Sequence, residues 1–342
     1  MTDIRTGPDA GPEPHAADPV AAVAAAADED ELLPLAVRQA RAASRGPKVE
    51  RVVAGRVHLP RRLRDLWRNR ELFVFLVRKE IKVKYKNSVL GFLWSMLNPA
   101  LTLLVYFVLF AYFLKNGIPL FVIYLFSAML AWNLFQTAVM SATSTIVGNS
   151  GIVKKVSFPR EILPLASVGS ALMFFLFQSI VLLAFLVAFR HAPAWSDLWL
   201  LVPALAALLL FAAAVSVFLA AVNVYFRDTQ HLVEVLLVAW FWGVPGVYAF
   251  SGHIHDALAK HNLLWIYLID PMTPIVMTFQ RIFYNVPHAI STQTHTPIQV
   301  MATYGAHWYL AADGIVIVVS IVLLLLAMVV FGRLEGNFAE EL

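Results

Sequence analysis

Cysteine is absent from this 342-residue chain, and charged residues make up only 14% of it. Without cysteine the fold has no disulfide, no thiolate metal site and no cysteine nucleophile, so packing and backbone hydrogen bonds must hold it together. The charged share is low beside the roughly 25% of an ordinary soluble domain, whereas hydrophobic residues reach 60%. This balance excludes a soluble globular protein and predicts a polytopic membrane protein.

A nucleotide-binding loop is also missing. Gly148, Gly151 and Lys154 suggest a phosphate loop at first sight. A P-loop, however, needs four residues between its glycines and then Gly-Lys-Ser/Thr after a strand. The spacing fails, so any ATP that the protein uses must be bound by another subunit.

The first 60 residues lack the features of a secretory signal. They are rich in alanine, proline and acidic residues, with hardly an aromatic, and they have neither the basic start nor the apolar core of a cleavable signal peptide. Such a composition is typical of a disordered or weakly helical segment. We expect residues 1–60 to form a cytosolic tail without chemistry of its own.

Six apolar runs are long enough to cross a hydrocarbon core, which takes about 20 residues in a helix. Within lipid, helices and closed barrels are the structures that satisfy every backbone polar group, and runs of this length favour helices. The sequence therefore predicts an all-α membrane domain over residues 93–342, with six spans at Leu93–Leu114, Phe121–Val147, Leu163–Phe189, Leu198–Tyr225, Leu232–Phe250 and Trp308–Phe331.

The basic residues beside these runs predict the orientation, because cytoplasmic loops carry the excess of lysine and arginine. Ten precede the first span: Arg61, Arg62, Arg64, Arg68, Arg70, Arg78, Lys79, Lys82, Lys84 and Lys86. The loops after the second and fourth spans and the segment after the sixth hold Lys154, Lys155, Arg160, Arg227 and Arg333. The opposite side holds Lys115, Arg190, Lys260 and Arg281. Both termini should be cytosolic.

The stretch from Arg61 to Lys86 is amphipathic. Apolar side chains such as Leu66, Phe73 and Val77 recur at helical steps of three and four residues, with charged residues between them. A helix of this kind lies at the lipid headgroups, with its cations on anionic lipid. Residues 61–92 should thus form an interfacial helix and a lead-in. It is either a plain membrane anchor or a collar that also contacts a cytosolic partner.

The loop between the second and third spans predicts a short helix of its own. Asn149, Ser150 and Gly151 combine helix stop and start signals, an apolar and basic segment follows, and Pro159 begins the entry into the next span. Gly243, Pro245 and Gly246 should interrupt the fifth span, because proline removes an amide donor and clashes with the preceding turn. This break is a candidate hinge for a gate.

Aromatic residues recur in the first, second and fifth spans. Aromatic rings stack on the flat C–H faces of sugar rings, and near span ends they also form interfacial belts. The candidates for lining a sugar path are Tyr106, Phe110, Trp132, Phe135, Trp240, Phe241 and Trp242.

The apolar runs in the segment between the fifth and sixth spans are too short to cross a membrane. Leu263–Ile269 and the helical stripe after Pro274 predict two short, half-inserted helices on the outer side. His253, His255, Asp256 and His261 in the same segment are residue types that bind zinc, but a solvent-exposed polar loop explains them as well. We expect no metal site.

Four separated segments together resemble one family. They are the run from Phe73 to Leu101, which contains RKEIKVKYKNSVLGFLWSMLNPAL, the loop KKVSFPREILPLA from Lys154, NVYFRDTQH from Asn223 and DPMTP from Asp270. In this order they look like the membrane subunit of ABC-2 type polysaccharide exporters, which move O-antigen, teichoic-acid, galactan and related lipid-linked glycans. The resemblance covers about Arg61 to Leu342.

The resemblance implies a transport subunit of a bacterial cytoplasmic membrane, not an enzyme. Two copies of the chain would pair, each with one cytosolic ATPase that binds ATP and Mg²⁺, and a lipid-linked polysaccharide would pass between the two copies. Membrane lipids are further partners, and nucleic acid is not expected. The ATPase-coupling residues would be Lys154, Lys155, Phe158, Arg160, Glu161, Arg227 and Asp228. The interfacial-helix residues would be Arg64, Trp67, Arg70, Phe73, Arg78 and Lys82.

A second function remains open on the residues alone. A membrane-embedded glycosyltransferase or polymerase acting on a lipid-linked sugar would need an outer active site, for which Asp256, Asp270 and Arg281 are candidates. Such enzymes place several acids and bases in a large external loop. The outer loop here is poor in carboxylates, which favours the exporter.

Overall fold

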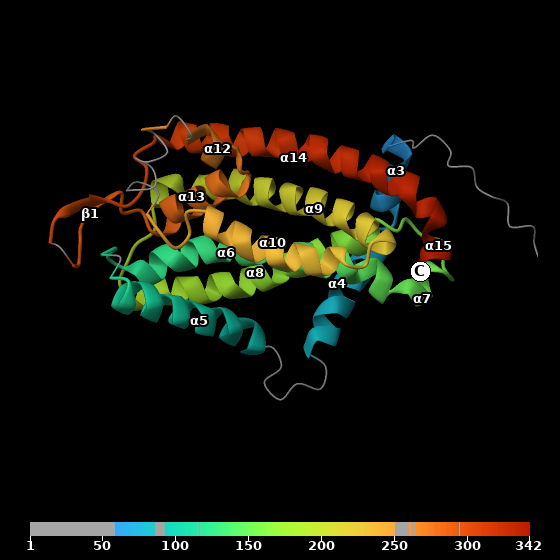
Figure 1. Ribbon diagram of the computed structural model, residues 1–342, viewed down its shortest axis with the longest axis horizontal. Coiled ribbons are helices and arrows are strands. Elements are labelled where there is room, and N and C mark those ends of the chain that lie inside the picture. The colour runs from blue at the N-terminus through green and yellow to red at the C-terminus, as the bar shows by residue number, and fades with distance from the viewer. Residues whose placement is uncertain (1–58, 86–92, 116, 250–259, 262–263, 294) are drawn as a thin grey trace, which may run out of the picture. The chain divides into compact units, whose positions relative to one another are not determined.

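The computed structural model describes residues 59–85, 93–115, 117–249, 260–261, 264–293 and 295–342. Most of this is helix, as the composition predicts, and a two-stranded antiparallel hairpin is formed by β1 (His288–Ile290) and β2 (Pro297–Gln299). The hairpin lies at one end of the helical bundle, and helices α3 and α7 lie at the other (Figure 1). We call these the hairpin end and the α3 end.

Four helical segments among the described residues are long and apolar enough to cross a membrane. They centre on α6 (Phe121–Gly148), α8 (Ile162–Ala188), α9 (Leu201–Tyr225) with the 3-10 turn η2 (Trp195–Leu200) before it, and α14 (Ala306–Leu334) with the 3-10 turn η3 (Glu335–Asn337) after it. These helices pack along one another (Figure 1). They agree closely with the second, third, fourth and sixth predicted spans.

The first and fifth predicted spans are shorter or irregular. The first is α5 (Leu93–Phe107), which continues as a six-residue π-helix, η1 (Val108–Phe113). The fifth is α10 (Thr229–Gly243), whose 15 residues extend for roughly 22 Å, less than the roughly 30 Å of a hydrocarbon core. Six spans therefore remain a prediction, of which four meet the length and hydropathy of a crossing helix.

The predicted interfacial helix is two helices, α3 (Leu59–Arg68) and α4 (Arg70–Tyr85). They divide at Asn69, whose side-chain amide donates to the carbonyl of Asp65 at 2.7 Å. That local bond competes with continued helix, as asparagine side chains commonly do. Helix α4 packs against α8.

Between α10 and α14 lie the two short helices that the sequence predicts, α12 (Leu264–Ile269) and α13 (Met272–Phe283). Helix α13 is buried almost throughout and packs on α6 and α9. Two four-residue helices, α7 (Ser150–Val153) and α15 (Phe338–Glu341), lie at the α3 end (Figure 1).

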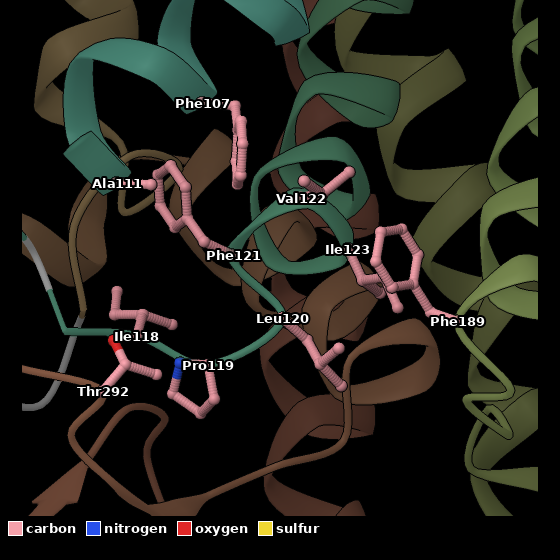
Figure 2. A pocket seen from close by; sticks show the side chains of 10 residues that line it. All are labelled: Phe107, Ala111, Ile118, Pro119, Leu120, Phe121, Val122, Ile123, Phe189 and Thr292. Atoms are coloured by element: carbon pink, nitrogen blue, oxygen red, sulfur yellow. The ribbon is translucent and has the colours of Figure 1, made fainter. Parts of the chain in front are cut away.

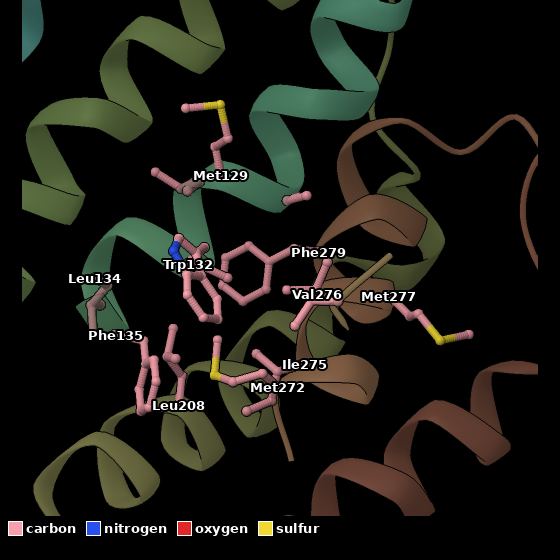
Figure 3. Close-up of a cluster of buried hydrophobic side chains, with 14 of the residues drawn as sticks. Met129, Trp132, Leu134, Phe135, Leu208, Met272, Ile275, Val276, Met277 and Phe279 are labelled. Carbon is pink, nitrogen blue, oxygen red and sulfur yellow. The ribbon is translucent and has the colours of Figure 1, made fainter. Parts of the chain in front are cut away.

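The core is centred on α6. In the most apolar 18-residue window of each helix, 78% of α6 is buried, against 28% of α14. Both helices are apolar on all sides, so hydropathy alone does not separate them. Met129, Trp132 and Phe135 of α6 belong to the same buried cluster as Met272 and Phe279 of α13 (Figure 3). Helix α6 is thus the inner helix of the bundle, whereas α14 leaves a broad apolar face uncovered.

Candidate functional site

A basic projection follows α7 at the α3 end. Val153 anchors it, with 2% of its surface exposed, while the next two residues, Lys154 and Lys155, are exposed. Asn149 holds the preceding turn, because its side chain donates to the Thr145 carbonyl at 2.8 Å and accepts from Lys79 of α4 at 3.0 Å. The sequence predicts a short apolar and basic helix here, which by the family resemblance would run from Lys154 to Arg160, and these bounds are wrong. The helix covers only Ser150–Val153, Lys154 and Lys155 form the turn after it, and residues 156–160 are not helical.

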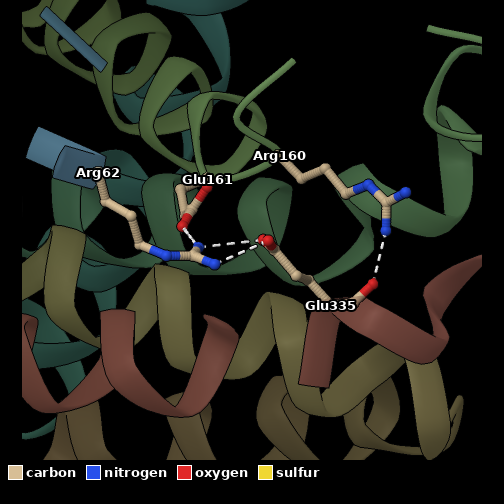
Figure 4. A network of polar contacts seen from close by, with 4 residues as sticks. All are labelled: Arg62, Arg160, Glu161 and Glu335. Carbon is tan, nitrogen blue, oxygen red and sulfur yellow. Dashed lines mark hydrogen bonds and ion pairs between the residues drawn. The ribbon is translucent and has the colours of Figure 1, made fainter. Parts of the chain in front are cut away.

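Arg160 and Glu161, which the sequence groups with these lysines, point inward instead. Glu161 is 1% exposed and pairs with Arg62 of α3 (Figure 4). The same guanidinium donates twice to the Glu335 carboxylate, at 2.7 and 3.1 Å. Arg160 donates to the backbone carbonyl of Glu335 at 2.7 Å. These four residues, hereafter the Arg62 network, join α3, the start of α8 and the end of α14.

The electrostatics of the Arg62 network are asymmetric, since two carboxylates share the Arg62 guanidinium. Burial, and then the nearby charge of Glu335, raise the pKa of Glu161 above its ordinary value, although Arg62 opposes the shift. A buried acid of this kind depends on its cationic partner. Arg62 therefore determines whether Glu161 can stay ionised beneath α3.

Helix α4 is fastened to α8 by both polar and apolar contacts. Glu80 accepts hydrogen bonds from the hydroxyls of Ser167 and Ser170, at 3.0 and 2.7 Å. One turn away, a Cβ added to Gly169 would lie 2.9 Å from the Phe73 ring and 2.8 Å from Val77. Any larger residue at this position would have to displace the Phe73 ring and the Val77 methyl group, so glycine lets these two side chains pack directly on α8.

The predicted interfacial residues differ in their surroundings. Phe73 is half-buried against α8, whereas Trp67 is 75% exposed. The four others, all charged, are exposed: Arg64, Arg70, Arg78 and Lys82. The exposed aromatic ring and the cations fit a headgroup boundary, so their predicted role at the interface is compatible with the packing of α4.

The turn from α9 to α10 exposes Arg227 and Asp228, and their predicted contact with an ATPase stays a prediction. They line a cavity of about 710 Å³ together with Phe226 and Glu341. Phe226 is 69% exposed, an unusual state for phenylalanine beside a polar rim. Tyr225 also lines the cavity. Its hydroxyl donates to the Leu334 carbonyl at 2.8 Å, and its ring contacts the buried ring of Phe338 edge-on.

The aromatic candidates form one connected cluster. Phe135 stacks on Phe211 with ring centroids 5.3 Å apart, and Trp132 lies 6.2 Å from Trp240. Trp132 and Phe135 are 3% and 0% exposed, so in this conformation neither contributes to a surface.

The rest of the cluster lies nearer the surface. Tyr106 of α5 stacks on Phe241 at 5.8 Å and meets Trp242 edge-on at 6.3 Å. Phe110 lies 6.1 Å from Trp242, which is 46% exposed. The accessible part of the cluster is therefore Tyr106, Phe110 and Trp242 at the junction of α5, η1 and α10.

Helix α10 ends at Gly243, where the sequence predicts a break, and Val244 is extended. The carbonyl of Pro245 accepts hydrogen bonds from Gln280 of α13 at 2.8 Å and from the Tyr124 hydroxyl of α6 at 3.2 Å. Tyr124 also donates to the Tyr248 carbonyl at 2.7 Å. The backbone of the candidate hinge is thus fixed to two other helices, and hinge motion would have to release these bonds.

Two residues of the alternative active site are engaged in structural bonds. Asp270 caps α13, accepting from the Met272 amide and the Thr273 hydroxyl at 3.1 and 3.0 Å, and it also accepts from Trp240 at 3.0 Å. Arg281 pairs with Asp197 at 2.8 Å. Of the group His253, His255, Asp256 and His261, the first three lie outside the described residues, and His261 is exposed. Across the part of the chain that the structure describes, no cluster of potential ligands has metal-site geometry.

A family model described as ABC-2 type transporter matches residues 71–284. The chain belongs to the ABC-2 type transporter family. It is 34% identical over 282 residues to the O-antigen export system permease protein RfbA of Myxococcus xanthus, covering 82% of this chain and 99% of that protein. A protein of the same name from Klebsiella pneumoniae is 25% identical over 272 residues, covering 80% of this chain and 95% of that protein.

Membership of the ABC-2 family identifies the chain as a multi-pass membrane subunit of an ABC transporter. The family match includes α4, α7, the α9–α10 turn and α13, but it ends before α14. Glu335, which completes the Arg62 network, therefore lies outside it. Sequence reasoning also missed Glu80, although a lone acid within the basic run of α4 is a signal that it has a specific partner.

Proposed function

We propose that this ABC-2 subunit moves a lipid-linked polysaccharide from the cytosolic to the outer side of a bacterial cytoplasmic membrane. The observation that carries the proposal is the match to O-antigen export permeases over nearly their whole length. The sugar, the polymer length and the lipid carrier are not part of it, and teichoic-acid or galactan cargoes fit the same architecture.

The α3 end is the proposed cytosolic side, where one ATPase docks on each of two copies and supplies bound ATP and Mg²⁺. Lys154 and Lys155 form one contact, and the α9–α10 turn with Arg227 and Asp228 forms the other. Phe158, half-buried beside the core at this end, supports the first contact. Arg160 and Glu161 act indirectly, because their bonds join the docking turn to α3 and α14.

The polysaccharide path lies between two copies of the chain. Helix α10 leaves a row of apolar side chains exposed, Leu232, Val235, Leu236 and Val238, and α5 leaves another at Leu101, Leu104 and Val105. These faces suit a second copy or lipid. Tyr106, Phe110 and Trp242 lie beside them and offer rings on which sugars can stack.

Depletion of the chain in a bacterium that makes it tests the function. Lipid-linked polysaccharide should accumulate on the cytosolic side of the membrane, because export stops while synthesis continues. An added glycan-cleaving enzyme should then reach this polysaccharide only after the cells are lysed. Normal delivery of polysaccharide to the outer surface would contradict the proposal.

Purified chain tests the alternative. Incubated with a radiolabelled nucleotide sugar and a lipid-linked acceptor, it should transfer no sugar, since Asp270 and Arg281 are engaged in structural bonds. Sugar transfer by the isolated chain would replace the exporter with a membrane-embedded transferase.

A further inference from the structure

An apolar pocket of about 260 Å³ lies at the hairpin end, between the ends of three helices (Figure 2). Phe107 comes from α5, Ala111 from η1, Phe121 and Ile123 from the start of α6, and Phe189 follows the end of α8. Phe121 and Ile123 are 3% and 0% exposed and form its floor, whereas Phe189 is 47% exposed. The pocket is therefore reached from the outside of the bundle, where membrane lipid surrounds a spanning helix.

The walls of the pocket are preformed. The segment before α6 is fixed to the hairpin, because the Thr292 amide donates to the Gly117 carbonyl at 3.0 Å. A Cβ on Gly117, whose φ is +73°, would lie 2.4 Å from the Ser291 hydroxyl oxygen. Leu120 also has a positive φ of 48°, a rare conformation for a bulky side chain. Because this wall is already ordered, a ligand would bind without the entropy cost of ordering it.

Two cations are close neighbours in the chain of residues that line this pocket. Arg190 directly follows Phe189, and Lys115 lies three residues before Ile118. Phe189 and Ile118 lie on opposite sides of the view in Figure 2. Both cations are exposed, and no ion pair or side-chain hydrogen bond is described for either within the described residues. Basic residues are scarce at this end, so two beside one apolar pocket call for an explanation.

We propose that the pocket binds one hydrocarbon chain of an anionic phospholipid, whose phosphate lies by Lys115 and Arg190. An apolar cavity of about 150 Å³ holds one benzene ring, so this pocket admits roughly ten carbons of a chain. Its position at the helix ends places the headgroup at the membrane boundary, where aromatic rings such as those of exposed Tyr112 and Phe113 also belong. This lipid site does not depend on the exported cargo.

Native mass spectrometry of the purified full chain, titrated with phosphatidylglycerol, tests the site. Replacing both cations, Lys115→Ala with Arg190→Ala, should weaken the tightest-bound lipid roughly thirtyfold, since a basic residue near a headgroup contributes about a factor of five to six. The conservative pair Lys115→Arg with Arg190→Lys should retain binding. Lys260→Ala, which removes another exposed cation between the fifth and sixth spans, is the matched control and should change nothing.

A substitution that fills the pocket tests separately whether the pocket holds the hydrocarbon chain of the lipid. Ala111→Phe should weaken phosphatidylglycerol about tenfold, whereas Val187→Phe, at an α8 residue that is 78% exposed and outside the pocket, should not. Thermal unfolding of each variant checks its folding. Equal lipid retention by the alanine pair and the unaltered chain would overturn the phosphate contact, and equal retention by Ala111→Phe would overturn the pocket.

Two further lipids establish the class of ligand. Phosphatidylethanolamine, which carries no net charge, should bind more weakly than phosphatidylglycerol, and equal binding would overturn the role of the cations. A polyprenyl phosphate that displaces phosphatidylglycerol at equal concentration would replace the phospholipid with a carrier lipid. Because no export is measured, these results stand whether or not the proposed function fails.

Discussion

The two ends of the bundle differ in the balance of their links. Both kinds of link occur at each end, since Arg160 and Tyr225 donate to backbone carbonyls at the α3 end and Arg281 pairs with Asp197 at the hairpin end. At the α3 end, the main links are ion pairs between side chains of α3, α8 and η3, in the Arg62 network. At the hairpin end, side chains donate to backbone carbonyls, as Tyr124 and Gln280 do to Pro245 and as Tyr284 does to Pro119 at 2.9 Å. Ion pairs can exchange partners when a charged subunit docks, whereas carbonyl bonds fix one backbone path. The comparison suggests an adjustable end and a fixed end.

The largest effect should come from breaking the Arg62 network. Arg62→Gln leaves Glu161 buried without its cation, which should cost about 3 kcal/mol of stability at pH 8, measured by thermal unfolding in detergent. The pKa of Glu161 is already raised and rises further without Arg62. The loss of stability should therefore shrink as the pH falls toward about 4.3, the ordinary pKa of a glutamate side chain, because the Glu161 carboxyl then takes up a proton.

Adding Glu161→Gln to Arg62→Gln should recover most of that stability and remove the pH dependence, since no buried charge remains. Arg61→Gln, at the exposed neighbouring position, is the control and should change stability by less than about 0.5 kcal/mol. Equal losses at pH 8 and pH 5 in the single variant would show that Glu161 does not carry the effect.

A smaller effect should follow from separating α4 and α8. Gly169→Ala puts a methyl group into the Phe73 and Val77 side chains, which should cost about 2 kcal/mol by overpacking. Gly148→Ala is the matched change, because a Cβ there meets nothing within 4 Å. Thermal unfolding of both variants gives the difference, and a Gly169→Ala protein as stable as Gly148→Ala would refute the close approach.

At the hairpin end, Tyr124→Phe removes the donor to Pro245 and Tyr248. Gln280 still satisfies the Pro245 carbonyl, so the cost should be about 1 kcal/mol, most of it from the Tyr248 carbonyl. Tyr112→Phe, at a ring that is 72% exposed, should cost almost nothing. Thermal unfolding gives both values, and hydrogen exchange at residues 244–248 should rise in the first variant alone.

The smallest effect on stability should come from the docking surface. Lys154→Ala with Lys155→Ala should change unfolding by less than about 0.5 kcal/mol, because both residues are exposed. Under the proposed function it should nevertheless lower export several-fold while ATP hydrolysis continues, measured with the assembled transporter in vesicles. Adding Arg160→Ala should also destabilise the α3 end, and unchanged export by the double variant would remove the coupling role.

The sequence predicts the long helices well because length and hydropathy determine them: α8 and α14 begin and end within a few residues of the expected runs. It does not predict that Glu161 faces inward, since its partner Arg62 lies 99 residues away along the chain, and Glu335, which shares that guanidinium, lies 174 residues away. Nor does hydropathy distinguish buried Trp132 from exposed Trp242. Both failures concern contacts between distant elements, which local patterns do not encode.

The close approach at Gly169 also bears on how the subunit moves. Phe73 and Val77 fill the space beside Gly169, and Glu80 accepts hydrogen bonds from two α8 hydroxyls. Any sliding of α4 along α8 would therefore have to displace these two side chains and break both hydrogen bonds.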